Sequence, residues 1–225
     1  MLKEGDEIMS EVWMEYFHKT FAEGETWGEL EPQSIDTALY GIGVMSVGDS
    51  GYKHSPKIIL PSADMIRIKI KYALAYDPNT TGTQKVGILF LKDDTALLDQ
   101  NGIDYQVITQ GTTSGNTTEY YHHELEFLYE YRTKKLIMKL DGLTLEETNY
   151  EENPQAVKIV ARTIDSSPNS SGVIIYDVYI EYTSTWVNMV NTLMLITIPI
   201  MLIMLLVTII PSILKALKRE KKEVK

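Results

Sequence analysis

Residues 65–76 read MIRIKIKYALAY, so large apolar side chains occupy every second position and basic or small ones occupy the positions between. Successive side chains of a β-strand point to opposite faces, and this period of two therefore predicts a strand with one buried and one solvated face. The same alternation recurs at residues 124–131, 136–140 and 157–164. Residues 173–182 are apolar or aromatic at nearly every position, which is typical of a central strand.

Clusters of turn-forming residues separate these strands, among them Asp77-Pro78-Asn79, Asp93-Asp94, Asn101-Gly102 and Ser166–Gly172. Many short alternating strands without intervening helices predict an all-β fold, an antiparallel sandwich or barrel. We expect ten residues in its core. They are Ile68, Ile70, Leu89, Leu125, Phe127, Met138, Leu140, Val160, Ile175 and Val178.

The N-terminal residues show a different period. Between residues 5 and 22, seven large apolar side chains recur at steps of three and four, with acidic residues between them. This spacing predicts an amphipathic helix that docks on the β-domain. Its acidic polar face argues against an interfacial membrane helix, which usually carries Lys and Arg there. The seven residues are Ile8, Met9, Val12, Trp13, Tyr16, Phe17 and Phe21.

The C-terminal part contains a long apolar segment. Residues 186–214 carry no charge, and residues 193–210 are almost wholly Leu, Ile, Met and Val. A helix that spans a bilayer needs about 20 apolar residues, so the segment predicts a transmembrane helix over residues 184–214. Pro199 lies in the middle of the segment, where we expect it to kink the helix.

Charge is distributed unevenly along the 225 residues, whose net charge is -10. The last fifteen residues hold six basic and two acidic side chains, which leaves residues 1–214 with a net charge of -14. Because Lys and Arg favour the inner side of a membrane, we expect the tail in the cytoplasm or virion interior and the body outside. The expected interface residues are Tyr182 and Trp186 on the outer side, and Lys215, Lys218 and Arg219 on the inner side.

Three sequons support an external body. Asn79-Thr-Thr, Asn116-Thr-Thr and Asn169-Ser-Ser lie in loop-like sequence and make these asparagines candidate glycosylation sites. Residues 1–20, in contrast, lack the charged-then-apolar layout of a signal peptide. A tail-anchored protein with a cytosolic body is therefore the alternative topology.

From about residue 30 onward, the order of segments resembles the concanavalin A-like, laminin G-type jelly roll. The residues that carry the resemblance are a hairpin ending in Lys139-Leu140-Asp141-Gly142 and a closing strand, Val173–Tyr182, with Asp177 inside it. The resemblance implies two antiparallel sheets packed face to face, with a face or rim loops that bind glycans or proteins. The expected organisation is an N-terminal helical segment (1–29), a jelly-roll ectodomain (30–183), a transmembrane helix (184–214) and a basic inner tail (215–225).

Glu124 and Glu126 are the most enzyme-like residues. Residues two apart on a strand share a face, and two carboxylates about 5–5.5 Å apart are what a retaining glycoside hydrolase requires. The stretch ELEFLYE departs, however, from the Glu-x-Asp-x-(x)-Glu pattern of jelly-roll hydrolases. A solvated strand face beside Lys134 and Lys139 is the alternative interpretation of these carboxylates.

Other chemistry has little support in the sequence. The chain has no cysteine, which excludes thiolate metal sites and cysteine nucleophiles, and its acidity argues against nucleic-acid binding. His122 and His123 are adjacent on a strand and should point to opposite faces, so they are not expected to share a metal ion. Four aspartates offer oxygen ligands for calcium but lack the EF-hand spacing. They are Asp93, Asp94, Asp99 and Asp104. We expect no cofactor and no metal.

Two classes of function remain. The first is a non-enzymatic surface protein whose jelly roll binds a glycan or a protein, or self-associates into a coat. A structural protein of an enveloped virus, archaeal viruses included, belongs to this class. The second is a membrane-tethered glycoside hydrolase that uses Glu124 and Glu126. Since the sequence shows no metal cluster and no nucleophile with a base, we expect binding or assembly and no catalysis.

Overall fold

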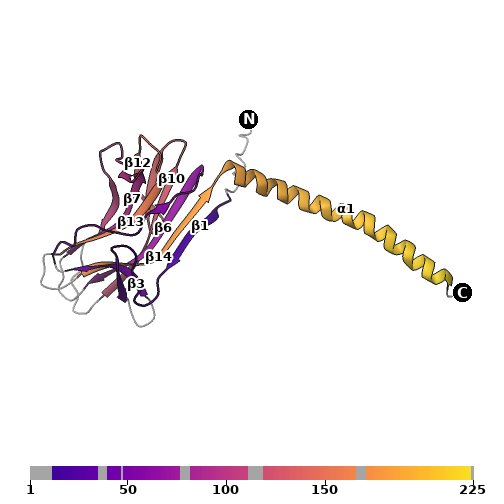
Figure 1. The fold of residues 1–225 in the computed structure, drawn as a ribbon, viewed down its shortest axis with the longest axis horizontal. Coiled ribbons are helices and arrows are strands. Elements are labelled where there is room, and N and C mark those ends of the chain that lie inside the picture. Colours follow the sequence, from indigo (N-terminus) through magenta and orange to yellow (C-terminus); the bar gives the residue numbers. More distant parts are fainter. Residues whose placement is uncertain are drawn as a thin grey trace, which may run out of the picture. The chain divides into compact units, whose positions relative to one another are not determined.

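A computed structural model of the chain describes residues 12–34, 40–46, 48–76, 82–110, 119–165 and 171–223. The chain divides into two compact units. Residues Trp13–Tyr182 form a β-sandwich, and the other unit contains the single helix of the described residues, α1 (Thr185–Glu223) (Figure 1).

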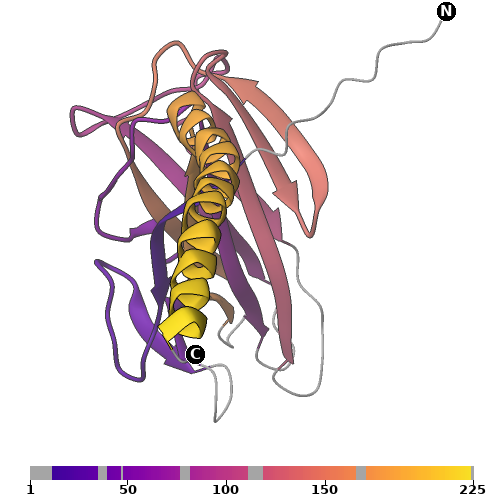
Figure 2. The ribbon, with the colours of Figure 1, turned by 90° about the vertical axis from the view of Figure 1, so that its right-hand side faces the viewer.

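The sandwich consists of two sheets, and every strand pair whose register is described is antiparallel (Figures 1 and 2). The larger sheet has the order β12-β11-β10-β6-β14-β3-β2, with β1 also paired to β14. Its strands are β1 (Met14–Thr20), β2 (Glu31–Ser34), β3 (Tyr40–Ser46), β6 (Met65–Tyr76), β10 (Glu119–Glu130), β11 (Lys135–Leu140), β12 (Leu143–Asn149) and β14 (Ser171–Thr183). This arrangement confirms the all-β, two-sheet sandwich.

The smaller sheet has the order β4-β13-β7-β8, with β5 paired to β13 and β9 paired to β7. Its strands are β4 (Lys53–His54), β5 (Ile58–Ile59), β7 (Gly82–Lys92), β8 (Thr95–Ala96), β9 (Tyr105–Gln110) and β13 (Ala156–Asp165). The long pair β7 and β13 forms the centre of this sheet and supplies the apolar side chains that face the larger one.

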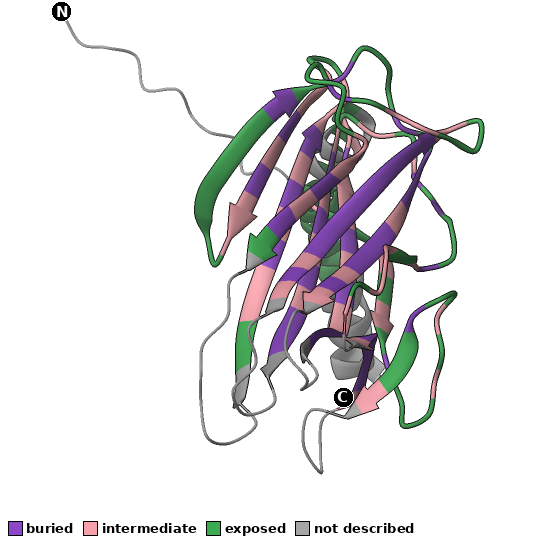
Figure 3. Cartoon of the chain, turned by 90° about the vertical axis from the view of Figure 1, so that its left-hand side faces the viewer, coloured by how far each residue is buried: buried purple, intermediate pink, exposed green. Residues whose placement is uncertain are grey.

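Strands β6 and β10 form the centre of the larger sheet. They pair over twelve residues, from Met65 opposite Glu130 to Tyr76 opposite Glu119. Alternate side chains of both strands are buried in the core that they share with β7 and β13 (Figure 3). They are Ile66, Ile68, Ile70, Tyr72 and Leu74 on β6, and Leu125, Phe127 and Tyr129 on β10. Phe90 of β7 meets Tyr129 of β10 edge to face, with ring centroids 5.3 Å apart. Aromatic contacts of this kind add to the free energy gained from buried area.

Nine of the ten predicted core residues are buried, and Leu140 is half-buried against the core. Leu89 and Val160 are buried on the opposite side of the smaller sheet from the one expected. They pack there beneath the half-buried side chains of Tyr52 and Tyr105. Their neighbours in sequence, such as Ile88, take the inward positions. Both faces of this sheet are therefore apolar at its centre.

The predicted N-terminal helix is wrong where the structure describes it. Residues Met14–Thr20 form strand β1, which pairs with the last part of β14. Residues 5–11 of the predicted helix lie outside the described residues. Pairing with β14 satisfies the backbone of this aromatic-rich segment, and aromatic side chains favour strands. The sandwich thus includes residues that precede position 30.

A bulge in β1 explains the misleading spacing. The register shifts by one residue between Glu15 and Phe17, and a bulge of this kind changes the face to which later side chains point. Trp13 consequently lies against Arg67 on the outer side of the sheet, whereas Phe17 packs against the core. Sequence spacing alone does not distinguish two faces of a bulged strand from one face of a helix.

Helix α1 contains the predicted apolar segment. Within it, Leu193–Pro211 is a 19-residue stretch of mean hydropathy 2.9, long and apolar enough to cross a membrane, and its described side chains are exposed. The helix continues through Pro199 and Pro211 with a gentle curve (Figure 1). The helix is therefore curved, and it is not interrupted at Pro199, where the kink was expected. The helix also runs past residue 214 into the basic tail.

The burial of Ile68 in the core leads to a first testable prediction. Ile68 is fully buried, so Ile68→Ala should lower the free energy of unfolding of the sandwich by about 2–5 kcal/mol, because it removes buried methylenes and leaves a cavity. Leu145→Ala is the control, since Leu145 on β12 is 51% exposed and its loss should change stability by less than about 0.5 kcal/mol. Urea unfolding of the full chain in detergent measures both values. Equal effects would contradict this core.

Candidate functional site

One side of the larger sheet faces away from the core and carries polar side chains from five neighbouring strands. We call it the charged face. Its residues are Glu15 and His18 on β1, Arg67, Lys69 and Lys71 on β6, Glu124 and Glu126 on β10, Lys139 on β11, and Asp177, Tyr179 and Glu181 on β14. They occupy the positions between the buried residues of the same strands, as the alternation requires.

Part of the charged face is an ion-pair network. Glu126 lies 2.8 Å from Lys139 Nζ and 3.6 Å from Arg67 Nε. Arg67 continues to Glu181 at 3.2 Å, and Lys69 Nζ lies 3.7 Å from the same carboxylate. The Arg67 guanidinium also stacks 3.9 Å from the centre of the Trp13 ring. These contacts hold the Glu126 carboxylate between two cations.

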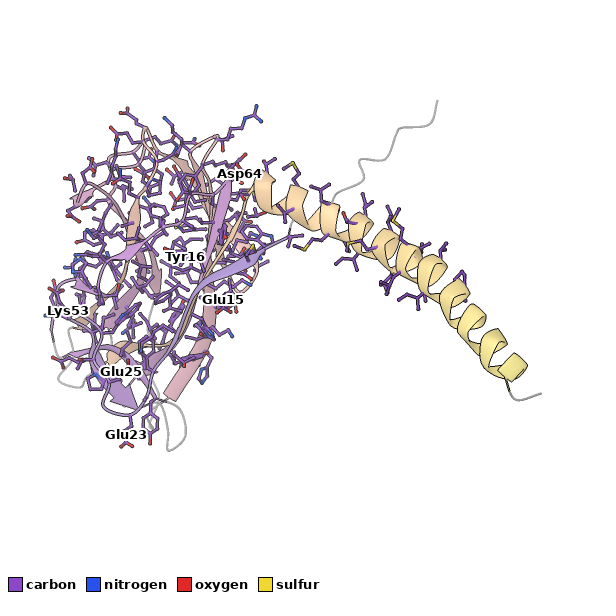
Figure 4. All side chains as sticks on the ribbon, turned by 45° about the vertical axis from the view of Figure 1, so that its right-hand side comes forward. Glu15, Tyr16, Glu23, Glu25, Lys53 and Asp64 are labelled. Atoms are coloured by element: carbon purple, nitrogen blue, oxygen red, sulfur yellow. The ribbon has the colours of Figure 1, made fainter. Side chains whose placement is uncertain are left out.

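Beside this network the charged face is hollowed into a groove with a volume of about 290 Å³. Asp177 lines this groove, with His18 Nε2 at 2.9 Å from one of its oxygens and Lys71 Nζ at 3.2 Å from the other. The Tyr179 hydroxyl donates a 3.0 Å hydrogen bond to Glu15, which Figure 4 labels on β1. The side chains that line the groove are His18, Lys69, Lys71, Glu124, Asp177 and Tyr179.

The electrostatics of the groove keep both donors and acceptors available. The hydrogen bond to Asp177 raises the pKa of Lys71, and the hydrogen bond to Glu15 raises the pKa of Tyr179. Lys71 therefore stays an ammonium and Tyr179 a neutral phenol near neutral pH. Since each carboxylate oxygen has two lone pairs, Asp177 keeps acceptor capacity for a ligand. The groove can thus bind a molecule that both donates and accepts hydrogen bonds.

The two carboxylates singled out in the sequence lie on the charged face, as expected, but in different surroundings. Glu124 lines the groove, whereas Glu126 belongs to the ion-pair network. The two histidines of β10 also separate as expected. His123 Nδ1 lies 2.8 Å from Asp141, and His122 packs edge to face against Tyr176.

Four residues of the groove were not singled out as site residues in the sequence: His18, Lys69, Lys71 and Tyr179. The sequence does contain one signal that points to the lysines, which is the match between the charge patterns of two strands. Basic residues alternate along β6 and acidic ones along β10, and the register places Glu124 opposite Lys71 and Glu126 opposite Lys69. β1 gives no such signal, because its bulge makes the spacing of its apolar side chains resemble that of a helix.

The three candidate glycosylation sites, Asn79, Asn116 and Asn169, lie outside the described residues. The strands that flank them nevertheless end together. β6 ends and β10 begins at one paired position, Tyr76 opposite Glu119, and β13 ends opposite the first residue of β7. This end of the sandwich is where β14 begins, and β14 runs from there to the opposite end.

The predicted interface residues divide between the two units. Tyr182 belongs to β14, where its ring meets that of Tyr16 edge to face at 6.2 Å. Packing within the sandwich therefore accounts for its position. Trp186, Lys215, Lys218 and Arg219 belong to α1, and their side chains lie outside what the structure describes.

Asp99, one of the aspartates considered for calcium, is instead a buried hydrogen-bond acceptor. One of its oxygens accepts the backbone N–H groups of Asn101 and Ile103, at 2.8 and 2.9 Å. The other accepts the Thr148 hydroxyl at 2.8 Å and the Gln106 amide at 3.3 Å. The two oxygens of Asp99 thus accept four hydrogen bonds from the protein, and these connect the loop that precedes β9 to Thr148 on β12.

Asp94 and Asp104, which were also considered as calcium ligands, have other partners. Asp94 forms an ion pair with Lys57, and an oxygen of Asp104 accepts the backbone N–H of Tyr105. In the described ranges, no group of three or more His, Asp and Glu side chains is placed to hold a metal ion.

No protein-family profile and no curated protein matches the chain. Solved structures are similar in fold. The catalytic domain of an endo-1,3-β-glucanase (laminarinase) from Thermotoga petrophila RKU-1 is 8% identical, with a TM-score of 0.45 over 77% of this chain and 99% of that one. A glycoside hydrolase family 16 endo-glucanase from Bacteroides ovatus is 10% identical, with a TM-score of 0.43 over 76% and 95%.

The metal-free carbohydrate recognition domain of Emp46p is 11% identical, with a TM-score of 0.40 over 69% of this chain and 88% of that one. A sialidase is also similar, at 10% identity and a TM-score of 0.38, and the chain spans 17% of its length. At these identities and TM-scores, the likenesses support no conclusion about a ligand or a reaction of this chain.

Asp99 makes a second prediction. Burial raises its pKa, but the hydrogen bonds from Ile103, Thr148, Asn101 and Gln106 outweigh burial and hold the pKa below its usual value. A lowered pKa stabilises the fold above the unfolded-state value of about 3.9, and this stability is lost as the pH falls through the folded-state value. Asp99→Asn should therefore lower the free energy of unfolding by about 2–4 kcal/mol at pH 7.

Urea unfolding of the full chain as a function of pH tests this expectation. The difference between the natural chain and Asp99→Asn should begin to shrink below about pH 4, where the unfolded chain takes up the proton. It should disappear only below the lowered folded-state pKa, where the carboxylate is protonated in both states. Asp104→Asn is the matched control, since Asp104 lies five residues away and is half-exposed. A difference that stays constant down to acidic pH would contradict the role of the Asp99 charge.

Proposed function

We propose that the protein is a single-pass membrane-anchored surface protein whose β-sandwich binds a glycan in the groove of the charged face, without hydrolysing it. The observation that carries the proposal is the lining of this groove. Six polar side chains from four neighbouring strands line a volume of about 290 Å³, and two of them, His18 and Tyr179, carry aromatic rings.

Sugar hydroxyls both donate and accept hydrogen bonds, so a glycan site needs both kinds of group at fixed positions. Lys69 and Lys71 supply donors, and Glu124 and Asp177 supply acceptors. Bonds to charged groups are stronger than neutral ones, which offsets the cost of removing water from the sugar. Because two ammonium groups face two carboxylates, the groove is suited to a neutral sugar.

The surroundings of Glu126 argue against catalysis. A retaining hydrolase needs one carboxyl group as acid and a second, free one as nucleophile. Glu126 is held by Lys139 and Arg67, so its oxygens are already committed to two cations. A hydrolase that uses Glu124 and Glu126 is the alternative function, and it would have to break these ion pairs for the reaction.

The membrane anchor rests on α1. Its Leu193–Pro211 stretch is sufficiently long and apolar, and the basic residues that follow favour the inner side of a membrane. The acidic body and its three sequons then lie outside. An anchor of this kind fixes many copies on one surface, so that weak contacts with a repeating glycan add through avidity.

Binding to neutral polysaccharides tests the function. The full chain in lipid nanodiscs should bind at least one member of a panel of neutral glycans and release no reducing sugar from any of them. Asp177→Asn should weaken binding about tenfold, because it removes the charge that organises His18 and Lys71.

Two controls separate binding from catalysis. Glu147→Gln removes a carboxylate that pairs with Lys135 on β11, away from the groove, and should leave affinity unchanged. Glu124→Gln and Glu126→Gln are assayed for turnover. Sugar release by the natural chain that disappears in either variant would establish the hydrolase and overturn the proposal.

Insertion of α1 tests the anchor. Leu202 lies midway along the apolar stretch, and Leu202→Arg should cost about 2.5–3.5 kcal/mol of insertion free energy. We expect the natural chain to remain in the membrane pellet after alkaline carbonate extraction and the variant to be partly released. Leu202→Phe is the control and should remain in the pellet. Full release of the natural chain would contradict the anchor.

A further inference from the structure

The smaller sheet also has a side that faces away from the core, and its charge differs from that of the rest of the molecule. We call it the basic face. Strands β7 and β13 present Lys85, Lys158 and Arg162 there, at positions between the inward residues. On the described strand positions of this face there is no carboxylate. In a chain of net charge -10, such a face is unusual.

Two of these cations oppose each other directly. Arg162 on β13 is the register partner of Lys85 on β7. Like charges at directly opposed positions of an antiparallel pair destabilise a sheet. A negative charge close to both cations relieves this repulsion, and an anion bound between the two strands would supply such a charge.

The Asp49 carboxylate partly compensates the positive charge of Lys85 and Arg162. Asp49, next to the end of β13, receives two hydrogen bonds from the Arg162 guanidinium, which lower the pKa of Asp49 to about 2. Among the described residues Lys85 and Lys158 form no ion pair, although the charge of Asp49 interacts with Lys85 and the charge of Asp94 with Lys158. The face therefore keeps excess positive charge that is available to a ligand. The cations of the charged face, in contrast, are each paired.

Aromatic rings lie beside these cations. Tyr52 and Tyr105 stack with ring centroids 4.1 Å apart and planes within 5°. The Arg162 guanidinium lies 5.1 Å from the centre of the Tyr52 ring, and His54 Nε2 lies 2.9 Å from the Tyr105 hydroxyl. The two rings cover Leu89 and Val160 and are only half-buried. They offer an apolar surface and hydroxyl groups next to the unpaired ammonium groups.

We propose that the basic face is a second binding site, for an acidic polysaccharide. Lys158 and Arg162 are four residues apart on β13, about 13 Å along the strand, so the cations form a row that suits anions repeated along a polymer. The tyrosines supply contact surface for the sugar rings, and the lysines neutralise the carboxylate or sulfate groups. The site lies on the other sheet from the groove, and Figure 4 shows Lys53 of β4 and Glu15 of β1 on opposite sides of the sandwich.

The experiment measures binding of the full chain in nanodiscs to three immobilised polymers at physiological salt. Polygalacturonate tests a carboxylate, dextran sulfate tests a sulfate, and neutral dextran tests the need for charge. We expect at least one of the acidic polymers to bind at the basic face. Any binding of neutral dextran should depend on the groove, so that Asp177→Asn weakens it and the lysine substitutions do not. The double variant Lys85→Gln/Lys158→Gln should weaken binding about tenfold or more and make it less salt-dependent, since fewer counterions are released.

The matched control is Lys92→Gln/Lys135→Gln, which makes the same change of net charge at lysines that pair with Glu152 and Glu147. It should keep the affinity of the natural chain. Binding in the groove should be unchanged in both double variants. The proposal is overturned if neither acidic polymer binds, if both double variants weaken binding equally, or if single-stranded oligothymidylate competes as well as the polysaccharide does.

Discussion

Along β6 and β10, successive side chains point alternately into the core and to the outer face of the larger sheet. Because the strands pair over twelve residues, one face presents the buried apolar side chains that meet β7 and β13, and the other presents cations opposite carboxylates. A slip of one residue would bury Lys69 and Glu126 and expose Ile68 and Phe127. The core and the charged face therefore depend on the same register, and neither can change without the other.

The sequence predicts those parts of the molecule whose pattern is local. The period of two identifies β6, β10, β11 and β13, and the uncharged segment identifies the apolar part of α1. β1 could not be identified, because its bulge and its pairing with β14 depend on residues about 160 positions away. The groove was missed for the same reason. Glu124 was identified, but Lys71 and Asp177 become its neighbours only through the strand order β10-β6-β14.

The two outward faces of the sandwich follow different electrostatic rules. On the larger sheet, charges of opposite sign alternate between neighbouring strands and largely cancel, which leaves a polar surface without a strong field. On the smaller sheet, Arg162 is paired with Asp49, whereas Lys85 and Lys158 form no ion pair among the described residues. Attraction of an anion at this second face falls as salt screens it, whereas directional hydrogen bonds in the groove are less sensitive to salt.

The central place of β14 has a mechanical consequence. This strand has β6 on one side and β1 and β3 on the other, and two residues after its last one the chain enters α1. Tension along β14 would load its hydrogen bonds to both neighbours at once and in shear, since these bonds run across the strand. A strand at the edge of the sheet would have hydrogen bonds on one side only, so the same load would fall on fewer bonds. The sandwich should therefore resist a pulling force that is applied through α1.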